Sequence, residues 1–180
     1  MNSRATAAIG GRFLELPEFL RAAGFRLRPE SEEDLAFLER LYVSVRWPEL
    51  EPTAWPDEAK VDFLRSQFRV QRQQYQTQYG GAQFVVLERG TVAAGRLCVL
   101  RGPQDFRIVD ISLLPEFRGQ GIGTGLLGAV IREAARIHAS VSLHVEKFNP
   151  AQRLYRRLGF VEAGESGPYW LMVRPPSETF

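Results

Sequence analysis

Residues 111–124 read Ile-Ser-Leu-Leu-Pro-Glu-Phe-Arg-Gly-Gln-Gly-Ile-Gly-Thr. The first four residues are typical of a strand end, a short loop follows, and a helix begins among the glycines. A helix N-terminus exposes backbone N–H groups without partners and carries the positive end of the helix dipole. Because glycines let an anion approach that backbone closely, the pattern predicts a turn that binds a pyrophosphate. A plain glycine-rich turn without a ligand is the alternative, since such turns are common.

Two other nucleotide-binding patterns fit this turn less well. A nucleoside-triphosphate loop needs Gly-Lys-Ser or Gly-Lys-Thr, and the turn contains no lysine. A dinucleotide fingerprint is closer, because residues 123–128 read Gly-Thr-Gly-Leu-Leu-Gly and Glu146 follows at the end of the next predicted strand. That fingerprint, however, needs its first glycine directly after a strand, and the strand here ends near Leu114. The spacing therefore favours an anion site at residues 118–124 over nicotinamide or flavin binding.

Hydrophobic periodicity and turn residues predict a mixed α/β sheet around this turn. The expected order is a strand, two helices, three strands, a helix, a strand, a helix and two strands. The strands are expected at residues 25–29, 83–88, 92–101, 106–114, 141–146, 160–163 and 169–173. The helices are expected at about 35–45, 61–79, 121–138 and 149–158, with a proline- and tryptophan-rich loop at 47–57. Ser31 and Asp34 have the spacing of a capping box before the first of these helices.

Length and composition indicate one globular domain. The chain has 180 residues, of which 44% are hydrophobic and 24% charged, and two full domains would be crowded in this length. We expect residues 1–24 to form an N-terminal extension with a short helix at 17–24, and residues 25–180 to form the domain. The formal net charge is only +2 and the basic residues are spread along the chain, which argues against a nucleic-acid partner.

Cysteine content and hydropathy bear on the compartment. The only cysteine, Cys98, excludes an intramolecular disulfide and fits a reducing environment. The first eleven residues lack the apolar stretch of a signal peptide, and no run approaches the roughly 18 apolar residues of a membrane span. We therefore expect a cytoplasmic protein without a membrane partner, either a monomer or a homodimer.

Two blocks of the sequence resemble the GNAT N-acetyltransferase superfamily. Residues 118–123, Arg-Gly-Gln-Gly-Ile-Gly, match its cofactor motif Arg/Gln-x-x-Gly-x-Gly/Ala and follow Leu113-Leu114-Pro115. Residues 149–160, Asn-Pro-Ala-Gln-Arg-Leu-Tyr-Arg-Arg-Leu-Gly-Phe, are similar to its later signature, which begins with asparagine and ends in Gly-Phe. The resemblance covers about residues 25–174. It implies an α/β (α+β) fold with a mixed, mostly antiparallel sheet of about six or seven strands and about four helices. The sheet would splay between the strands ending near Leu114 and Glu146.

The resemblance also implies a site for acetyl-CoA as co-substrate, without a metal. The turn residues expected to bind the cofactor are Arg118, Gly119, Gln120, Gly121, Ile122, Gly123 and Thr124, and the backbone amides of residues 120–124 would hold the pyrophosphate. The strand end at Leu113 and Leu114 would pair with the pantetheine arm, and the N–H near Leu113 would polarise the thioester carbonyl. Asn149 would contact the pantetheine or the sulfur side, and Tyr155 would lie near the sulfur.

Acyl transfer to an amine needs a proton donor for the departing thiolate and a base for the attacking amine. Tyr155 suits the first task, although it also fits the apolar face of a short helix and could be a core aromatic. Asp110, His144 and Glu146 are the candidate bases, since His144 and Glu146 share one face of their strand and Asp110 lies on the strand before the glycine turn. Each of the three could equally be a structural group.

These residues predict an N-acetyltransferase that moves the acetyl group of acetyl-CoA to a primary amine of a small molecule or peptide. Direct attack in a ternary complex is expected, because Cys98 lies mid-strand and buried cysteines usually behave as small hydrophobes. A non-catalytic acyl-CoA-binding module on the same fold is the alternative. Glu49, Glu51 and Asp57 in the loop at 47–57 would suit a cationic acceptor, unless that loop is simply solvated.

Overall fold

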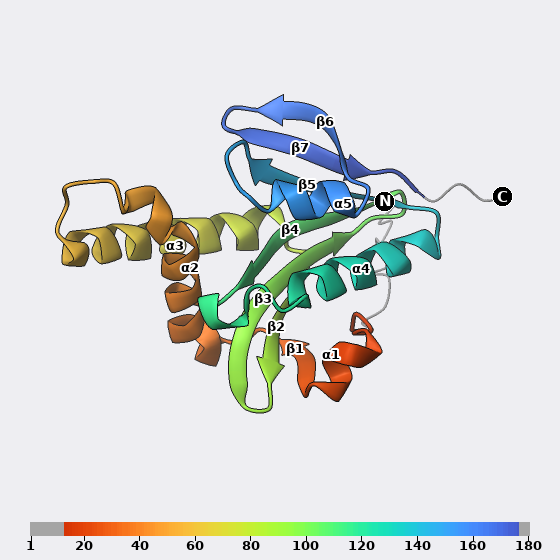
Figure 1. The fold of residues 1–180 in the computed structure, drawn as a ribbon, viewed down its shortest axis with the longest axis horizontal. Helices are drawn as coiled ribbons and strands as arrows, with labels where there is room; N and C mark the ends of the chain where they lie inside the picture. The colour runs from red at the N-terminus through yellow and green to blue at the C-terminus, as the bar shows by residue number, and fades with distance from the viewer. Residues whose placement is uncertain (1–12, 177–180) are drawn as a thin grey trace, which may run out of the picture.

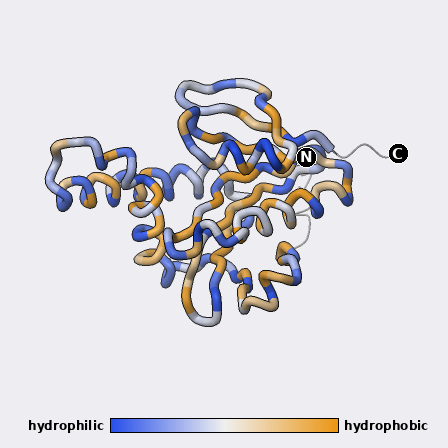
Figure 2. The backbone as a smooth tube through the Cα atoms, viewed as in Figure 1, coloured by the Kyte–Doolittle hydropathy of each residue, from blue (hydrophilic) through white to orange (hydrophobic). Residues whose placement is uncertain are grey.

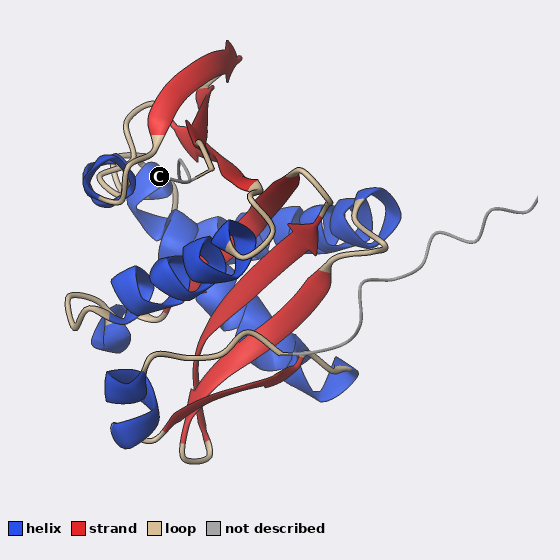
Figure 3. Ribbon diagram, turned by 90° about the vertical axis from the view of Figure 1, so that its right-hand side faces the viewer, coloured by secondary structure: helices blue, strands red, loops and turns tan. Residues whose placement is uncertain are grey.

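The computed structural model describes residues 13–176, which form one seven-stranded sheet with helices on both faces (Figures 1 and 3). The strands are β1 (Phe25–Pro29), β2 (Gln83–Arg89), β3 (Val92–Arg101), β4 (Asp105–Leu113), β5 (Ser140–Glu146), β6 (Val161–Ser166) and β7 (Tyr169–Arg174). The α-helices are α1 (Glu18–Ala22), α2 (Leu35–Leu50), α3 (Asp57–Gln78), α4 (Ile122–Ala135) and α5 (Gln152–Arg157). Two short 3-10 helices are η1 (Glu32–Asp34) and η2 (Pro115–Phe117). The predicted α+β fold with a mixed sheet is confirmed.

The strand order is β1-β2-β3-β4-β5-β7-β6, and every neighbouring pair is antiparallel except β4 and β5. Those two central strands run parallel, but they pair only from Asp105 opposite Ser140 to Ile108 opposite Leu143. Beyond this point β4 stays with β3 and β5 stays with β7, so the two halves of the sheet diverge (Figure 1). The predicted splay between these strands is confirmed.

A β-bulge in β4 decides which of its side chains face the splay. Asp110 pairs with Cys98 and Ile108 pairs with Val99, which leaves Val109 as an extra residue. A bulge of this kind shifts the alternation of side chains by one position. Phe106 and Ile108 belong to the main core before the bulge, and Ile111 and Leu113 pack against the same core after it. Arg107 and Asp110 are three residues apart, and both consequently lie on the face of the sheet that points away from this core.

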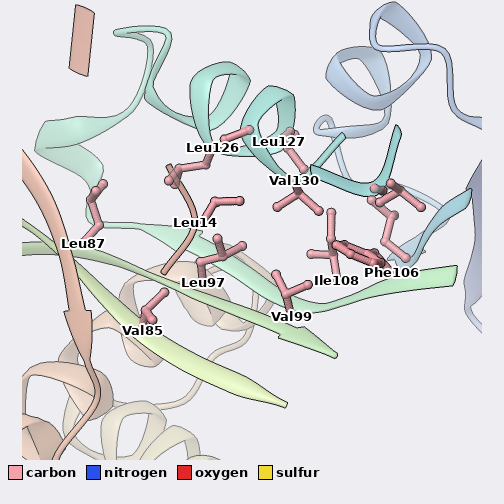
Figure 4. Close-up of a cluster of buried hydrophobic side chains, with 14 of the residues drawn as sticks. Leu14, Val85, Leu87, Leu97, Val99, Phe106, Ile108, Leu126, Leu127 and Val130 are labelled. Atoms are coloured by element: carbon pink, nitrogen blue, oxygen red, sulfur yellow. The ribbon is translucent and has the colours of Figure 1, made fainter. Parts of the chain in front are cut away.

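Two hydrophobic clusters cover the two faces of the sheet. The larger cluster lies between the sheet and helices α1 and α4 (Figure 4), and it includes Val85, Leu97, Ile108, Leu126 and Val130. The smaller cluster lies under α2 and α3, and it consists of Phe37, Leu38, Leu41, Phe68, Val86 and Leu114. Successive strand residues point to opposite faces, so β2 sends Val85 to one cluster and Val86 to the other. Hydrophobic residues are accordingly concentrated along the central strands (Figure 2).

The segment before β1 packs against the larger cluster. Leu14, Leu16 and Leu20 are 6%, 6% and 1% exposed and belong to it. A β-carbon on Gly125 would lie 2.8 Å from Leu20 Cδ1 and 2.9 Å from Phe19 Cζ, so α1 touches α4 where α4 has no side chain. Residues 1–12, half of the predicted extension, lie outside the described residues.

The predicted start of the loop at residues 47–57 is wrong, because α2 continues through Trp47 and Pro48 to Leu50. Proline breaks a helix interior by removing one N–H and crowding the preceding turn. Pro48 lies in the last turn, where the Glu51 N–H still donates to Trp47 O at 3.0 Å and only one hydrogen bond is lost. At the start of the preceding segment the Ser31 N–H donates to Asp34 Oδ2 at 2.9 Å, as the capping-box spacing predicts.

Candidate functional site

The glycine turn lies at the start of α4, where its backbone could hold an anion. Gly119 and Gly121 have φ angles of +73° and +76°, and Gly121 is the N-cap residue of the helix. The first helical hydrogen bond runs from the Gly125 N–H to Gly121 O at 2.9 Å, so the N–H groups of residues 122–124 precede the intrahelical ladder. A β-carbon on Gly121 would meet no atom within 4 Å, so the backbone angle, not the space, requires glycine. This geometry fits a pyrophosphate.

Side chains of the same turn fold back onto its backbone. Arg118 Nε donates to Leu113 O at 2.8 Å, and Gln120 Nε2 donates to Glu116 O at 2.7 Å. These two hydrogen bonds stabilise the turn, and the N–H groups of residues 122–124 stay available to an anion.

The two residues predicted to contact the pantetheine arm, Leu113 and Leu114, face different ways at the end of β4. The Leu114 N–H donates to Ala94 O of β3 at 2.9 Å, and its side chain is buried in the smaller cluster. Since neighbouring N–H groups of a strand point to opposite edges, the Leu113 N–H faces the gap toward β5. Leu113 is therefore placed to contact a ligand in the gap, whereas Leu114 faces β3 and the core.

A pocket of about 430 Å³ occupies the gap between β4 and β5. All four predicted catalytic residues, Tyr155, Asp110, His144 and Glu146, line it, as does Asn149. The wall formed by α2, α3 and the β6–β7 turn is largely aromatic, with Tyr42, Phe68, Tyr75, Tyr79 and Tyr169. The structure thus brings together every predicted catalytic side chain, although each has different partners.

Tyr155 lies on α5 with its ring packed edge-on against Phe160, at 5.9 Å between ring centroids. The residue is 8% exposed and belongs to the larger cluster, as a core aromatic would, and it also lines the pocket, where the predicted donor role places it. Burial, and secondarily the charge of Asp110, raises the pKa of Tyr155 to about 12. Its phenol therefore stays protonated at neutral pH and remains a proton donor.

Asp110 belongs to a charged network on β3 and β4. Its carboxylate accepts from Arg96 Nη1 and from Ser112 Oγ, both at 3.3 Å. Arg96 also donates to Glu30 at 2.8 Å, so one guanidinium is shared by two carboxylates. Burial raises the pKa of Asp110, and Arg96 opposes the rise without cancelling it.

Glu146 and His144 alternate with the core residues of β5, as predicted, and each contacts an arginine. Glu146 forms an ion pair with Arg46 of α2, which also lies 3.1 Å from Glu49. His144 is exposed, and its Nδ1 contacts the guanidinium of Arg107. The sequence interpretation missed all three pocket arginines, although Arg107 lies only three residues before Asp110.

Asn149 and Gln152 connect β5 to α5. Asn149 Oδ1 accepts the Ala151 N–H at 2.8 Å, which leaves its Nδ2 as the group that a ligand could contact. Gln152, which the sequence interpretation also missed, is 6% exposed and donates to Glu146 O and Lys147 O at 2.9 and 2.7 Å. These bonds hold α5, and hence Tyr155, against the end of β5.

Two other predicted features lie apart from the pocket chemistry. Cys98 is fully buried, and burial raises the pKa of its thiol, so it is a poor nucleophile. Of the acidic loop residues, Glu49 approaches the pocket only through Arg46, whereas Glu51 and Asp57 are exposed and do not line it. Within residues 13–176 no cluster of three or more His, Cys, Asp or Glu side chains could hold a metal ion. The same residues include no helix that is both long and apolar enough to cross a membrane.

A sheet that splays beside a glycine-capped helix, with a phosphate cradle next to the gap, defines the class of acyl-CoA-dependent acyltransferases. The sequence model of the acetyltransferase (GNAT) family matches residues 44–160, and the chain belongs to this family. It is therefore an acyl-CoA-dependent acetyltransferase. Comparison with curated proteins gives no match.

Solved acetyltransferase structures share the fold. The PaiA N-acetyltransferase of Thermoplasma acidophilum, solved in complex with coenzyme A, is 18% identical with a TM-score of 0.63, and the match covers 84% of this chain and 98% of that one. An acetyltransferase of Thermus thermophilus is 20% identical with a TM-score of 0.59, covering 84% and 96%. A protein of Corynebacterium glutamicum described as histone acetyltransferase HPA2 and related acetyltransferase is 20% identical with a TM-score of 0.60, covering 87% and 98%.

Proposed function

We propose that the protein transfers the acetyl group of acetyl-CoA to a primary amine of a small molecule or peptide, by direct attack in a ternary complex. The observation that carries this proposal is that Asp110 and Tyr155 line the same pocket, in the gap between β4 and β5. When bound, acetyl-CoA supplies an activated acyl group and a thiolate leaving group. Every other task falls to side chains and backbone groups of this chain.

Binding and polarisation are tasks of the backbone. The N–H groups of residues 122–124 would hold the pyrophosphate, as the cradle geometry favours. The Leu113 N–H would donate to the acyl oxygen, where negative charge develops as the amine attacks. A donor fixed in a strand needs no reorganisation during the reaction, which is the source of its catalytic benefit.

Proton transfers are tasks of two side chains. As the bond between the amine nitrogen and the acyl carbon forms and the carbon–sulfur bond breaks, the Tyr155 hydroxyl gives its proton to the thiolate. The amine nitrogen loses a proton to a base at the same end of the pocket. The raised pKa of Tyr155, about 12, keeps the proton on the phenol at neutral pH, so that this donor is present when the thiolate leaves.

Of the three predicted bases we favour Asp110. Its charge influences Tyr155, so the two groups lie close, and burial raises its pKa toward the range in which a carboxylate can accept a proton. The negative charge of Glu146 is paired with Arg46. His144 has Nδ1 turned to the guanidinium of Arg107, which occupies the lone pair that a base would use.

Two measurements test the proposed function. Calorimetric titration with acetyl-CoA should show binding that is lost when Gly121 and Gly123 are both changed to valine, and NADH should not bind. Acetyl-CoA consumption with a panel of primary amines, followed by mass spectrometry, should show the N-acetylated product. Binding without turnover of any amine would support the alternative, a non-catalytic acyl-CoA-binding module. No acetyl-CoA binding would refute both.

A further inference from the structure

Arg107 is the one pocket arginine for which residues 13–176 provide no ion pair. Its Nη1 donates to Ser142 Oγ at 3.3 Å and its Nη2 contacts His144 Nδ1. Within residues 13–176 it forms no ion pair. Asp105 lies close enough for its charge to act on the pKa of Arg107, but its oxygens accept from Ser140 and Ser142, and the Ser142 hydroxyl bridges the two side chains. Burial lowers the pKa of Arg107, as expected for a cation that is desolvated without full compensation.

The other two arginines of the pocket are neutralised. Arg46 is paired with Glu146 and Glu49, and Arg96 with Glu30 and Asp110. The charged side chains that line the pocket are thus three arginines and two carboxylates, Asp110 and Glu146. Arg46 and Arg96 each face two carboxylates, whereas Arg107 is in no ion pair among the described residues. Buried charges are normally paired, so an unpaired guanidinium in a pocket indicates a site for an anion.

We propose that Arg107 and His144 bind an anionic group, a carboxylate or a phosphate, that the acceptor carries in addition to its amine. This inference rests on the proposed function and defines its substrate class. A guanidinium has five N–H donors, and only two are engaged here, so a fork of donors remains for an oxyanion. His144, whose Nδ1 faces a donor, carries its proton on Nε2 and offers a second N–H to the same anion.

The position of Arg107 along β4 sets the length of the acceptor. Arg107 pairs with Leu100 and Asp110 pairs with Cys98, so across the bulge the two residues are two strand positions apart, about 7 Å along the sheet. The amine and the anion would therefore be separated by several bonds, as in an ω-amino acid or a dipeptide. Tyr75 and Tyr79 line the pocket between α3 and the strands and would cover the connecting methylene groups. A polyamine would bring a second cation toward Arg107 and should be a poor acceptor.

Four amines of similar length test the inference. They are hexylamine, 6-aminohexanoate, 5-aminopentyl phosphate and cadaverine, which differ in the group at the far end. We expect at least one of the two anionic amines to have a kcat/KM about 10- to 100-fold above that of hexylamine, the range that charge-assisted hydrogen bonds provide. Cadaverine should be the poorest. Comparison of the carboxylate with the phosphate identifies the preferred anion.

Arg107→Gln should abolish the preference for the anionic amine, mainly through KM, and leave hexylamine turnover within about twofold. Arg69→Gln is the matched control, because Arg69 is an exposed arginine of α3 outside the pocket. Arg107→Lys keeps the charge but not the paired N–H donors of the guanidinium, so it should retain part of the preference. It also provides a second test if the glutamine variant does not fold. Equal loss of activity toward all four amines in Arg107→Gln, or a wild-type preference for hexylamine or cadaverine, would overturn the inference.

Failure of the inference is distinguishable from failure of the proposed function. Turnover of hexylamine without any preference for an anionic amine refutes only the anion site. If none of the four amines is acetylated, calorimetric titration of 6-aminohexanoate and of 5-aminopentyl phosphate into the protein saturated with coenzyme A decides the matter. Binding of either that is lost in Arg107→Gln supports the site even without turnover, and no binding of both refutes it.

Discussion

Gly121→Ala should weaken acetyl-CoA binding and cost a definable amount of stability. Gly121 has a φ of +76°, and an L-residue in this left-handed region costs about 1–2 kcal/mol. Alanine also restricts the unfolded chain, which offsets about 0.4–1 kcal/mol. The net loss is about 1 kcal/mol, equivalent to a fall in Tm of about 2–4 °C for a chain of this size. Because the added carbon meets no atom within 4 Å, the folded protein should otherwise be unchanged.

Gly90→Ala is the matched control for this change. Gly90 lies in the turn between β2 and β3 with a φ of +61°, and a β-carbon there also meets nothing within 4 Å. Both variants should lose similar stability in differential scanning calorimetry. Only Gly121→Ala should raise the Kd of acetyl-CoA, by about tenfold or more, since one charge-assisted hydrogen bond contributes about 1.5–3 kcal/mol.

Two results would refute the reasoning. An unchanged Kd in Gly121→Ala, together with the expected fall in Tm, would mean that the N-terminus of α4 does not hold the pyrophosphate. A Tm unchanged in both variants would mean that the left-handed backbone angles impose no cost on alanine. Gly123→Ala separates the two effects further, since Gly123 does not have a positive φ and its β-carbon would make an ordinary contact of 3.7 Å with Leu154.

Tyr155→Phe should lower kcat about 10- to 100-fold and leave the Kd of acetyl-CoA within about twofold, because the ring contact with Phe160 remains. Asp110→Asn should lower kcat/KM. The activity of the wild type should rise with pH as Asp110 loses its proton, and the variant should lack this rise. Because burial raises the pKa of Asp110, the stability of the wild type should also decline relative to that of the variant as the pH increases from about 4. Asp34→Asn should lower the free energy of unfolding by about 2 kcal/mol at pH 7 and by little near pH 2. Hydrogen bonds from Arg28 lower the pKa of Asp34 from 3.8 to about 2, and the stability that they provide is lost as the carboxylate becomes protonated. Cys98→Ala should keep kcat within about twofold, and iodoacetamide should not label the folded wild type, because burial raises the pKa of the thiol.

Each of these predictions has a control or a contradicting result. For Asp34→Asn the control is Glu33→Gln, an exposed neighbour whose change should leave the pH dependence of Tm unaltered. Full activity of Tyr155→Phe would remove Tyr155 as the proton donor. A pH–rate profile of Asp110→Asn that matches the wild type would transfer the role of base to His144 or Glu146. An acetylated Cys98 found by mass spectrometry would contradict direct transfer.

The sequence predicted the glycine turn and the start of α4 well, because their requirements are local. A strand end, a glycine with a left-handed backbone and a helix start all lie within residues 111–124, and no distant contact is needed to arrange them. The positions of the strands were predicted for the same reason, with half of their ends unchanged and the others shifted by one to three residues. The end of α2 was missed, since the tolerance of Pro48 depends on its place in the last helical turn.

The pocket was predicted less completely, because it depends on contacts between distant segments. Nothing in the sequence marks Val109 as a bulged residue, so simple alternation would place Arg107 and Asp110 on opposite faces. The pairing of Glu146 with Arg46 joins residues that are 100 positions apart, which sequence spacing cannot reveal. Which charges are paired, and therefore which cation is free to bind a ligand, follows only from the folded arrangement.

The contact of α1 with Gly125 has a consequence for how the gene can be shortened or fused. Leu20 and Phe19 lie against the bare backbone of α4 one turn after the cradle, so the helix that carries the anion site rests on residues encoded before the first strand. A protein that starts at Phe25 would expose an apolar stripe on α4 and remove the support on one side of the cofactor turn. Affinity tags and fusion partners are best attached before residue 13, where they leave the contact between α1 and α4 in place.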